Sequence, residues 1–165
     1  MSGLLNADEI FEMAEQFERN GAKFYRTAAA QSVGAEANEL LQRLAAMEDV
    51  HEMTFRALRK ALIGDAMFQT LQDPEQEAVK YLRAWVDKHI FRADKDPSKA
   101  IGSGTPLAQI LDTAIGMEKE SIAFYVGIKE FVPIDKGRIK VDKIIQEEMS
   151  HITTLIEELM KLEKS

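Results

Sequence analysis

The sequence repeats itself with an offset of 100 residues. When the chain is laid over itself at that offset, glutamate, tyrosine and histidine coincide at four pairs of positions. The pairs are Glu18 and Glu118, Tyr25 and Tyr125, Glu48 and Glu148, and His51 and His151. We infer two similar helical hairpins that each bring two carboxylates and one imidazole to a common place, which is the set of side chains that a two-metal site needs.

The composition favours an all-helical protein with one domain spanning residues 1–165. A chain of 165 residues with 45% hydrophobic residues is long enough to bury a substantial core. Only four prolines interrupt it, and the stretches between them are rich in Ala, Leu, Glu, Lys, Gln and Met, which favour helix.

Charge and cysteine content exclude several classes of function. A net charge of -7 argues against nucleic acid or an anionic membrane as the main partner, because both need a basic surface. No apolar run reaches the length of a membrane span, and Asp8 and Glu9 stand where a secretory signal would be apolar, so we expect a cytoplasmic protein. The absence of cysteine excludes thiolate zinc sites and Cys-ligated iron centres within these residues.

Apolar spacing and breaking residues divide the chain into four long helices and one short one. The long helices are expected from Asn6 to residues 32–34, from there to Gly64, from Thr105 to about Val132, and from Asp135 onward, with Asn6, Thr105 and Asp135 as N-caps. Leu82, Trp85, Val86 and His89 mark the short helix, and residues 92–104 are expected to form a loop. Short connections make antiparallel hairpins of the first and last pairs, whereas the middle connection of about 40 residues can cross the bundle.

The six repeated acidic and histidine residues are the candidate metal ligands. Glu48 and His51, like Glu148 and His151, are three residues apart, which places the two side chains about 60° apart around a helix. Glu18 and its repeat partner lie on apolar helix faces, where an uncompensated carboxylate would be costly. Two divalent cations would balance four glutamates, and mixed carboxylate and imidazole ligands suit Fe or Mn better than Ca²⁺ or Mg²⁺.

Other polar residues leave alternatives open. The two tyrosines either pack in the core or hydrogen-bond a metal carboxylate from the opposite hairpin. His89 has no repeat partner and is expected at the surface or in an interface. The repeat fails at five further acids, which are expected to be solvated or to lie just outside the ligands: Glu9, Glu12, Glu15, Glu52 and Glu147. Glu15 and Glu147 are within one turn of a candidate ligand and are alternatives to it.

The segments at 18–25 (ERNGAKFY), 48–51 (EDVH), 118–125 (EKESIAFY) and 148–151 (EMSH) resemble the ferritin-like superfamily, and within it the rubrerythrin diiron domain. The resemblance extends over nearly the whole chain. It implies a ferritin-like four-helix bundle with a long crossover and a carboxylate-bridged pair of iron ions. By this likeness Glu18 and Glu118 each serve one metal, Glu48 and Glu148 bridge, His51 and His151 cap, and Tyr25 and Tyr125 orient the ligands.

Two departures from the rubrerythrin pattern shape the expected function. Rubrerythrins usually carry a cysteine-bearing rubredoxin domain, but these 165 residues contain no cysteine, so we expect electrons to come from an external donor protein such as a rubredoxin. The additional glutamate that rubrerythrins carry one turn after the third-helix ligand is Ser121 here, which brings the ligand set closer to that of an ordinary ferritin-like oxidase.

We therefore expect a diiron protein that reduces H₂O₂ or O₂. Manganese or a mixed metal pair in place of the two iron ions is the alternative. The six ligands would also be the catalytic residues. Two further functions stay open: a ferroxidase for iron storage or detoxification, and a metal-binding bundle without turnover. The resemblance also implies a homodimer.

Overall fold

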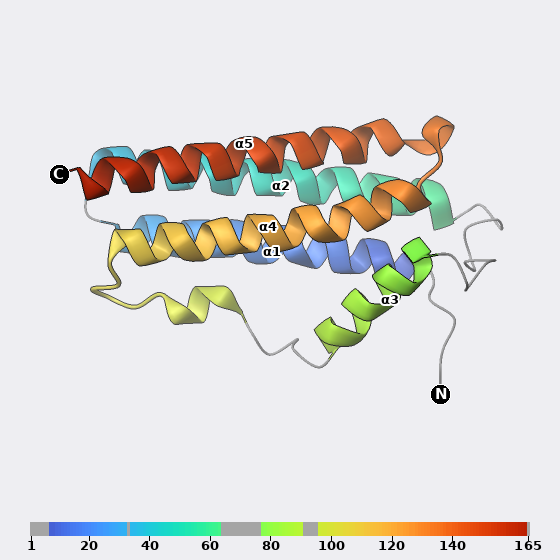
Figure 1. Cartoon of the computed structure of the whole chain (residues 1–165), viewed down its shortest axis with the longest axis horizontal. Helices are drawn as coiled ribbons and strands as arrows, with labels where there is room; N and C mark the ends of the chain where they lie inside the picture. Colours follow the sequence, from blue (N-terminus) through green and yellow to red (C-terminus); the bar gives the residue numbers. More distant parts are fainter. Residues whose placement is uncertain (1–6, 33, 64–76, 91–95, 165) are drawn as a thin grey trace.

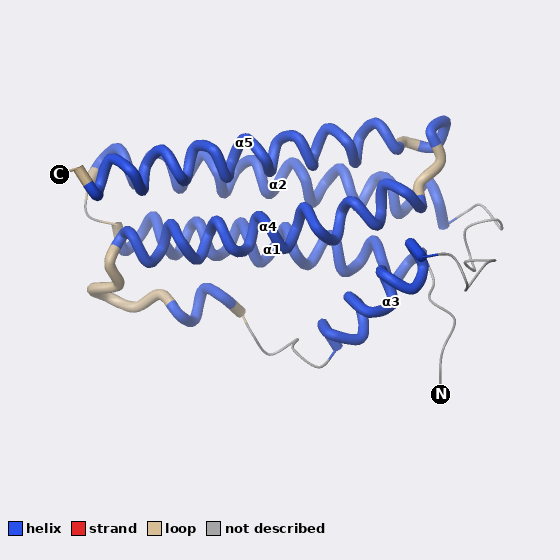
Figure 2. Tube along the Cα trace, in the orientation of Figure 1, coloured by secondary structure: helices blue, strands red, loops and turns tan. Residues whose placement is uncertain are grey.

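Four long helices lie side by side and form the body of the molecule (Figure 1). The computed structural model describes residues 7–32, 34–63, 77–90 and 96–164. The long helices are α1 (Ala7–Gln31), α2 (Ala35–Ile63), α4 (Leu107–Phe131) and α5 (Arg138–Glu163). A shorter helix, α3 (Glu77–Ile90), and two 3₁₀ turns, η2 (Pro97–Ala100) and η3 (Ile134–Lys136), complete the described structure. No strand occurs in these ranges (Figure 2), which confirms the all-helical prediction.

The long helices pair as two hairpins. α1 packs most extensively against α2, and α4 packs most extensively against α5. The crossover between the hairpins contains α3 and η2, which pack mainly on α4 and α1 respectively. Figure 1 shows both on the side of the bundle that α1 and α4 form. The four-helix bundle with a long crossover is therefore confirmed.

Proline ends α4 and starts η2 for the same physical reason. Pro133 cannot continue a helix and keeps the preceding Val132 extended, at φ -80° and ψ 124°. Pro97 stands in the first turn of η2, where no backbone N–H is needed, and the Asp96 side chain caps that turn by accepting a hydrogen bond from the Ser98 N–H. The loop expected at 92–104 thus contains one helical turn.

Two of the three expected N-caps are wrong by one or two residues. Pro106, not Thr105, precedes the first turn of α4, because the Thr105 hydroxyl instead accepts a hydrogen bond from the Gly102 N–H at 2.9 Å. Asp135 lies within η3, and Gly137 precedes α5 with a φ of 117°, a conformation that glycine adopts without steric cost. The third cap, Asn6, lies outside the described residues.

Two apolar clusters fill the bundle, one toward each end. The first joins α1, α2, α4 and α5 with α3, and its large buried members are Ile10, Phe11, Phe55, Leu58, Leu62, Leu82, Phe124, Tyr125 and Ile128. The second joins the opposite halves of the four long helices through Phe24, Tyr25, Leu40, Leu41, Leu44, Ile110, Leu111 and Leu155. No helix of the described residues is long and apolar enough to span a bilayer.

Candidate dimetal centre

A buried polar cluster lies between the two apolar clusters, at mid-length of the four long helices. α1 and α4 contribute one glutamate each, while α2 and α5 contribute a glutamate and a histidine each. The members are Glu18, Glu48, His51, Glu118, Glu148 and His151, and none is more than 4% exposed. The structure therefore brings all six sequence-predicted ligands to one place.

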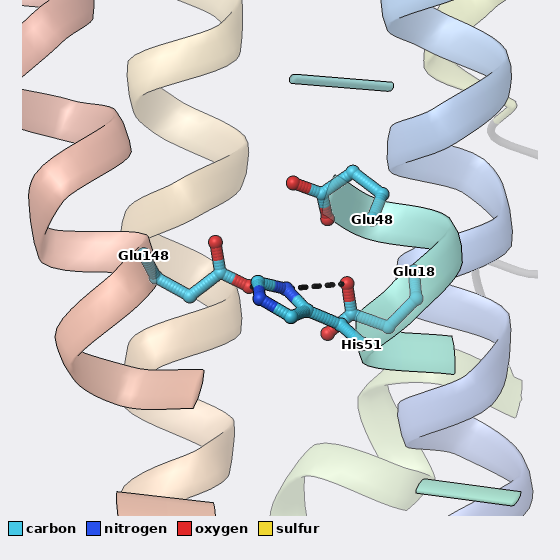
Figure 3. A group of neighbouring side chains, drawn as sticks. All are labelled: Glu18, Glu48, His51 and Glu148. Atoms are coloured by element: carbon cyan, nitrogen blue, oxygen red, sulfur yellow. Dashed lines mark ion pairs between the residues drawn. The ribbon is translucent and has the colours of Figure 1, made fainter. Parts of the chain in front are cut away.

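The six residues form two overlapping groups, each able to surround one metal ion. Glu18 and His51 complete one group with Glu48 and Glu148, and within it one ligand atom from each residue lies within 4.8 Å of the others. Figure 3 shows these side chains converging from α1, α2 and α5. The second group is Glu48, Glu118, Glu148 and His151. Because Glu48 and Glu148 belong to both, the arrangement suits two metal ions bridged by carboxylates.

Both imidazoles turn Nδ1 toward the carboxylates. His51 Nδ1 lies 3.2 Å from Glu148 Oε1 and 3.5 Å from Glu18 Oε2. His151 Nδ1 lies 2.9 Å from Glu148 Oε2 and 3.3 Å from Glu48 Oε1. The two rings are nearly parallel, with centroids 5.7 Å apart and an interplanar angle of 21°. The equivalent histidines thus present the same nitrogen to the two candidate metal positions.

The donor atoms of this cluster fit a pair of metal ions. Among the described residues, buried oxygens of Glu18, Glu48 and Glu148 and the Nδ1 atoms of both histidines have no hydrogen-bond partner. Unpartnered buried polar atoms are costly, and several on converging carboxylates need positive charge between them. Mixed carboxylate and imidazole donors are ligands of Fe, Mn and related ions. The cluster is therefore a candidate dimetal site.

Each buried tyrosine hydroxyl donates to a glutamate of the opposite hairpin. Tyr25 of α1 donates to Glu118 of α4, and Tyr125 of α4 donates to Glu18 of α1. Burial and nearby carboxylates raise the pKa of both phenols well above the usual value, so they remain protonated donors. The hydrogen-bonding role predicted for them is present, together with packing in the apolar clusters.

The two histidines differ in what lies behind them. His51 Nε2 is 3.0 Å from Glu147 Oε2, whereas His151 Nε2 is buried without a hydrogen-bond partner among the described residues. Under the offset of 100, the position equivalent to Glu147 is Met47. Glu147 is thus placed behind a histidine rather than among the candidate ligands, and the two candidate metal positions are chemically unequal.

Without metal, the carboxylates hold both histidines protonated. Burial by itself lowers the pKa of His51, but contacts with Glu148 and Glu18 outweigh it and raise the pKa to about 11. Burial opposes protonation of His151 as well, and its contacts with Glu118, Glu148 and Glu48 raise its pKa to about 12. Imidazolium charge therefore takes the place of metal charge in the metal-free cluster.

The carboxylates share protons unequally. Burial, followed by the charges of Glu48 and Glu118, raises the pKa of Glu148 to about 8. Burial and neighbouring carboxylates also raise the pKa of Glu48 well above the usual value, and burial raises that of Glu18. For Glu118, burial is outweighed by hydrogen bonds with His151, Glu148 and Tyr25, which lower its pKa.

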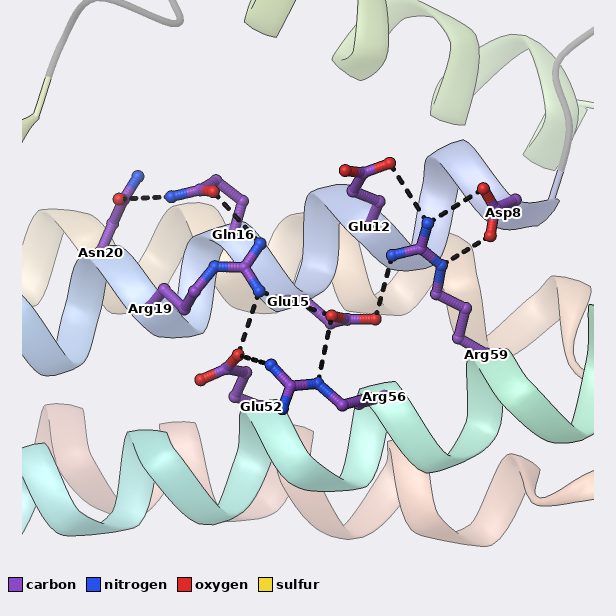
Figure 4. Close-up of polar contacts among 9 residues, drawn as sticks. All are labelled: Asp8, Glu12, Glu15, Gln16, Arg19, Asn20, Glu52, Arg56 and Arg59. Atoms are coloured by element: carbon purple, nitrogen blue, oxygen red, sulfur yellow. Dashed lines mark hydrogen bonds and ion pairs between the residues drawn. The ribbon is translucent and has the colours of Figure 1, made fainter.

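A network of ion pairs joins α1 to α2 beside the cluster and accounts for several of the remaining acids (Figure 4). Glu15 is buried and pairs with three arginines: Arg19 at 3.4 Å, Arg56 at 3.6 Å and Arg59 at 3.3 Å. Glu12 pairs with Arg59, and Glu52 with Arg19 and Arg56. Glu15 therefore links α1 to α2 through ion pairs, and it is neither solvated nor a candidate metal ligand. The side chain of His89 lies outside the described residues.

Gly21 gives Glu48 the space it occupies. A Cβ at Gly21 would lie 3.1 Å from Glu48 Oε2, closer than ordinary van der Waals contact. Ser121 is the equivalent residue on α4. Together with Gly21, Glu48 and Glu118 it lines a cavity of about 520 Å³. The cluster therefore has an opening on its α1 and α4 side, next to the group that contains Glu118.

Comparison with solved structures gives the fold. No family model and no curated protein matches the chain. A crystal structure described as a "putative ferritin-like diiron-carboxylate protein" from Thermotoga maritima matches it with a TM-score of 0.71 and 24% sequence identity, covering 100% of both chains. The fold is ferritin-like. In such bundles metal sites form from side chains that project inward from facing helices, as the six residues of this cluster do.

Proposed function

We propose that the protein is a diiron-carboxylate redox protein that reduces hydrogen peroxide or dioxygen with electrons from an external donor. The observation that carries the proposal is the pair of overlapping four-residue groups that share Glu48 and Glu148. Six ligands with only two nitrogens favour iron or manganese, and we propose iron. Two findings support the choice of iron: the fold is ferritin-like, and the solved structure that the chain resembles is described as that of a diiron-carboxylate protein.

The proposed ligands would hold one iron ion in each group, and iron would supply electrons to an oxidant that reaches it. Glu18 and His51 would serve the first position, Glu118 and His151 the second, and Glu48 and Glu148 both. The protein's remaining task is to keep these side chains in place.

Hydrogen bonds and the apolar surroundings perform that task. Tyr25 and Tyr125 fix the carboxylates of Glu118 and Glu18 from across the bundle, so each hairpin orients a ligand of the other. The two apolar clusters cover the site along the bundle axis and keep bulk water from it there. The cavity beside Glu48 and Glu118 supplies the way in for a small oxidant.

Electrons are proposed to come from a separate protein. Reduction of H₂O₂ to two molecules of water takes two electrons and two protons. The 165 residues contain no cysteine, so they hold no thiolate-ligated carrier that could supply those electrons. An external donor such as a rubredoxin would return the metal pair to its reduced state after each reaction.

Anaerobic loading with two Fe²⁺ per chain, followed by rapid mixing with H₂O₂ or O₂, tests the function. We expect near-ultraviolet ferric absorbance to develop in a single turnover, and the faster oxidant identifies the substrate. Subsequent addition of a reduced one-electron donor should restore the starting spectrum. If neither H₂O₂ nor O₂ produces ferric absorbance, the proposal is contradicted. Release of the oxidised iron as product would also contradict it.

Variants test the ligands separately from the reaction. Glu48→Ala should lose both metal positions, because Glu48 belongs to both groups, whereas His151→Ala should retain one. Glu39→Gln, at an exposed position of the same helix α2, removes a carboxylate outside the cluster and should bind two ions. Normal binding of two ions by Glu48→Ala would show that the ligands are assigned wrongly.

A further inference from the structure

The cavity beside the cluster is larger than a diatomic or triatomic oxidant requires. Its volume of about 520 Å³ lies within the range of roughly 300–1,000 Å³ typical of pockets that bind small organic molecules. Its lining begins at the buried residues Glu48, Glu118 and Tyr25 and extends to η2, whose Lys99 and Ala100 are exposed. The cavity therefore connects the candidate metal site with the surface.

The walls between these two ends are mostly apolar. Phe17 and Met117 stand on α1 and α4, and Pro97 and Ala100 close the side formed by η2. Asn20 and Ser121 add uncharged polar groups. Apolar walls with a few polar groups favour a ligand whose body is apolar.

Among the residues that the structure describes, the charged side chains at the surface end of the cavity leave one cation without an ion-pair partner. Apart from the cluster itself, four charged residues line the cavity: Lys88, Asp96, Lys99 and Glu120. Lys88 pairs with Glu120 at 3.3 Å, and Asp96 pairs with Lys23 of α1. Lys99 makes no ion pair with any residue that the structure describes. An anionic group at the mouth would find its counter-charge there.

η2 is fixed in place as the wall of this cavity. The Asp96 carboxylate accepts hydrogen bonds from the Ser98 N–H at 3.0 Å and the Ser98 hydroxyl at 2.6 Å, and it also accepts one from Lys23. One side chain thus caps η2 and ties it to α1. The cavity is preformed, which lowers the entropic cost of binding.

We propose that this cavity binds an organic molecule with an apolar body and a single anionic head, the body between Phe17 and Met117 and the head at Lys99. The head faces outward because the carboxylates of Glu48 and Glu118 already line the inner end of the cavity. That the bound molecule lies next to a redox-active metal pair rests on the proposed function, whereas the binding itself does not.

Isothermal titration calorimetry with octanoate, octanol and octylamine tests the proposal, using the metal-loaded and the metal-free protein. These three probes share one apolar body and differ in the charge of the head. We expect octanoate to bind best. Trp85, the single tryptophan of the chain, should report binding by fluorescence, because its ring centroid is 6.4 Å from that of Phe17.

Two variants with matched controls locate the ligand. Lys99→Glu should weaken octanoate binding at least about tenfold, whereas Lys60→Glu makes the same charge change at an exposed position outside the lining and should have no effect. Ser121→Leu should fill the cavity and abolish binding of octanoate and octanol. Gln109→Leu, at an exposed position of α4, should not.

Circular dichroism and thermal melts show whether each variant is folded. Absence of octanoate binding to the folded protein, equal binding of octanoate and octylamine, or binding that survives Ser121→Leu would each overturn the proposal. None of these measurements involves iron oxidation. A protein that binds octanoate but does not react with an oxidant would therefore disprove the proposed function alone.

Discussion

Glu147 and Met47 occupy equivalent positions in the two hairpins, yet only the first places a carboxylate behind a histidine. A carboxylate at Nε2 fixes the orientation of an imidazole and increases the electron density at its other nitrogen. His51 has this support, whereas no residue that the structure describes provides it to His151. At the scale of single residues, the candidate centre is therefore asymmetric although its ligands are paired.

We predict that Glu147→Gln weakens one of two metal-binding steps and leaves the other unchanged. Loss of the carboxylate behind a ligating histidine typically costs about 10- to 100-fold in metal affinity. A competition titration with Co²⁺ and a chromophoric chelator resolves the two steps. The matched change Met47→Glu should strengthen the second step, and Met47→Leu should alter neither. Equal weakening of both steps by Glu147→Gln would contradict this account.

The repeat made the six candidate ligands predictable because both halves need the same donors. The repeat could not predict the placement of Glu147, because the equivalent residue in the other half is Met47 and a comparison of the halves finds only shared residues. Glu15 illustrates a second reason. Its burial depends on three arginines, two of which come from α2, and such long-range pairs are not visible in the spacing along α1.

At the scale of elements, α3 is held on α4 by close contact at Gly127. A Cβ at Gly127 would lie 2.9 Å from both Leu82 Cδ2 and Tyr81 Cδ1. The Tyr81 hydroxyl also donates a hydrogen bond of 2.6 Å to the Ala123 carbonyl. α3 in turn contributes Lys88 to the cavity. The packing of this short helix thus bears on the binding site as well as on the core.

We predict that Gly127→Ala loosens α3. The added methyl requires α3 to shift, at a cost of about 1–3 kcal/mol typical of overpacking, and amide hydrogen exchange over residues 77–90 should accelerate. Gly116→Ala is the matched control, because it lies in the same helix with nothing within 4 Å of the added Cβ. That variant should gain about 0.5–1 kcal/mol of unfolding free energy. Equal stability of the two variants would refute the role of Gly127.

Helix number, order and approximate ends were predictable because apolar periodicity and proline act locally. The start of α4 was not, because Thr105 bonds to Gly102 in the preceding turn rather than to the helix. α5 begins after Gly137, a glycine with positive φ that follows η3. Asp135 lies within η3, ahead of that glycine, and therefore does not cap α5. Caps are decided by competition between neighbouring hydrogen bonds, which the residue types alone do not settle.

At the scale of the whole molecule, the fold brings four glutamates together in its interior, and their negative charge has to be compensated by protons or metal ions. Two hairpins each carry two glutamates into the middle of the bundle, where apolar clusters on both sides remove solvent screening. Protons on His51, His151 and the carboxylates compensate this charge without metal, and metal ions would displace those protons. Stability, metal affinity and pH are therefore linked through one cluster.

We predict that between pH 5 and 8 the stability of the metal-free protein falls with pH, whereas that of the metal-loaded protein does not. Glu148, with a folded-state pKa of about 8 against a usual 4.5, holds a proton that the unfolded chain releases, and both histidines do the same above 6.5. The metal-free protein then loses up to about 1.4 kcal/mol per pH unit for each such proton as pH rises. Asp96, whose pairing with Lys23 lowers its pKa to about 2, titrates below this window.

Metal binding reverses the slope because its affinity increases as the ligands lose protons. The unfolding free energy from urea titrations at pH 5, 6, 7 and 8 should therefore fall with pH in the presence of chelator. In the presence of excess Mn²⁺, which avoids oxidation during the measurement, it should rise with pH up to about 6.5 and level off above that pH, because the unfolded chain then no longer binds histidine protons. Glu148→Gln removes one titrating group and should flatten the metal-free curve. Parallel curves with and without metal would mean that these protons and the metal ions do not share the cluster.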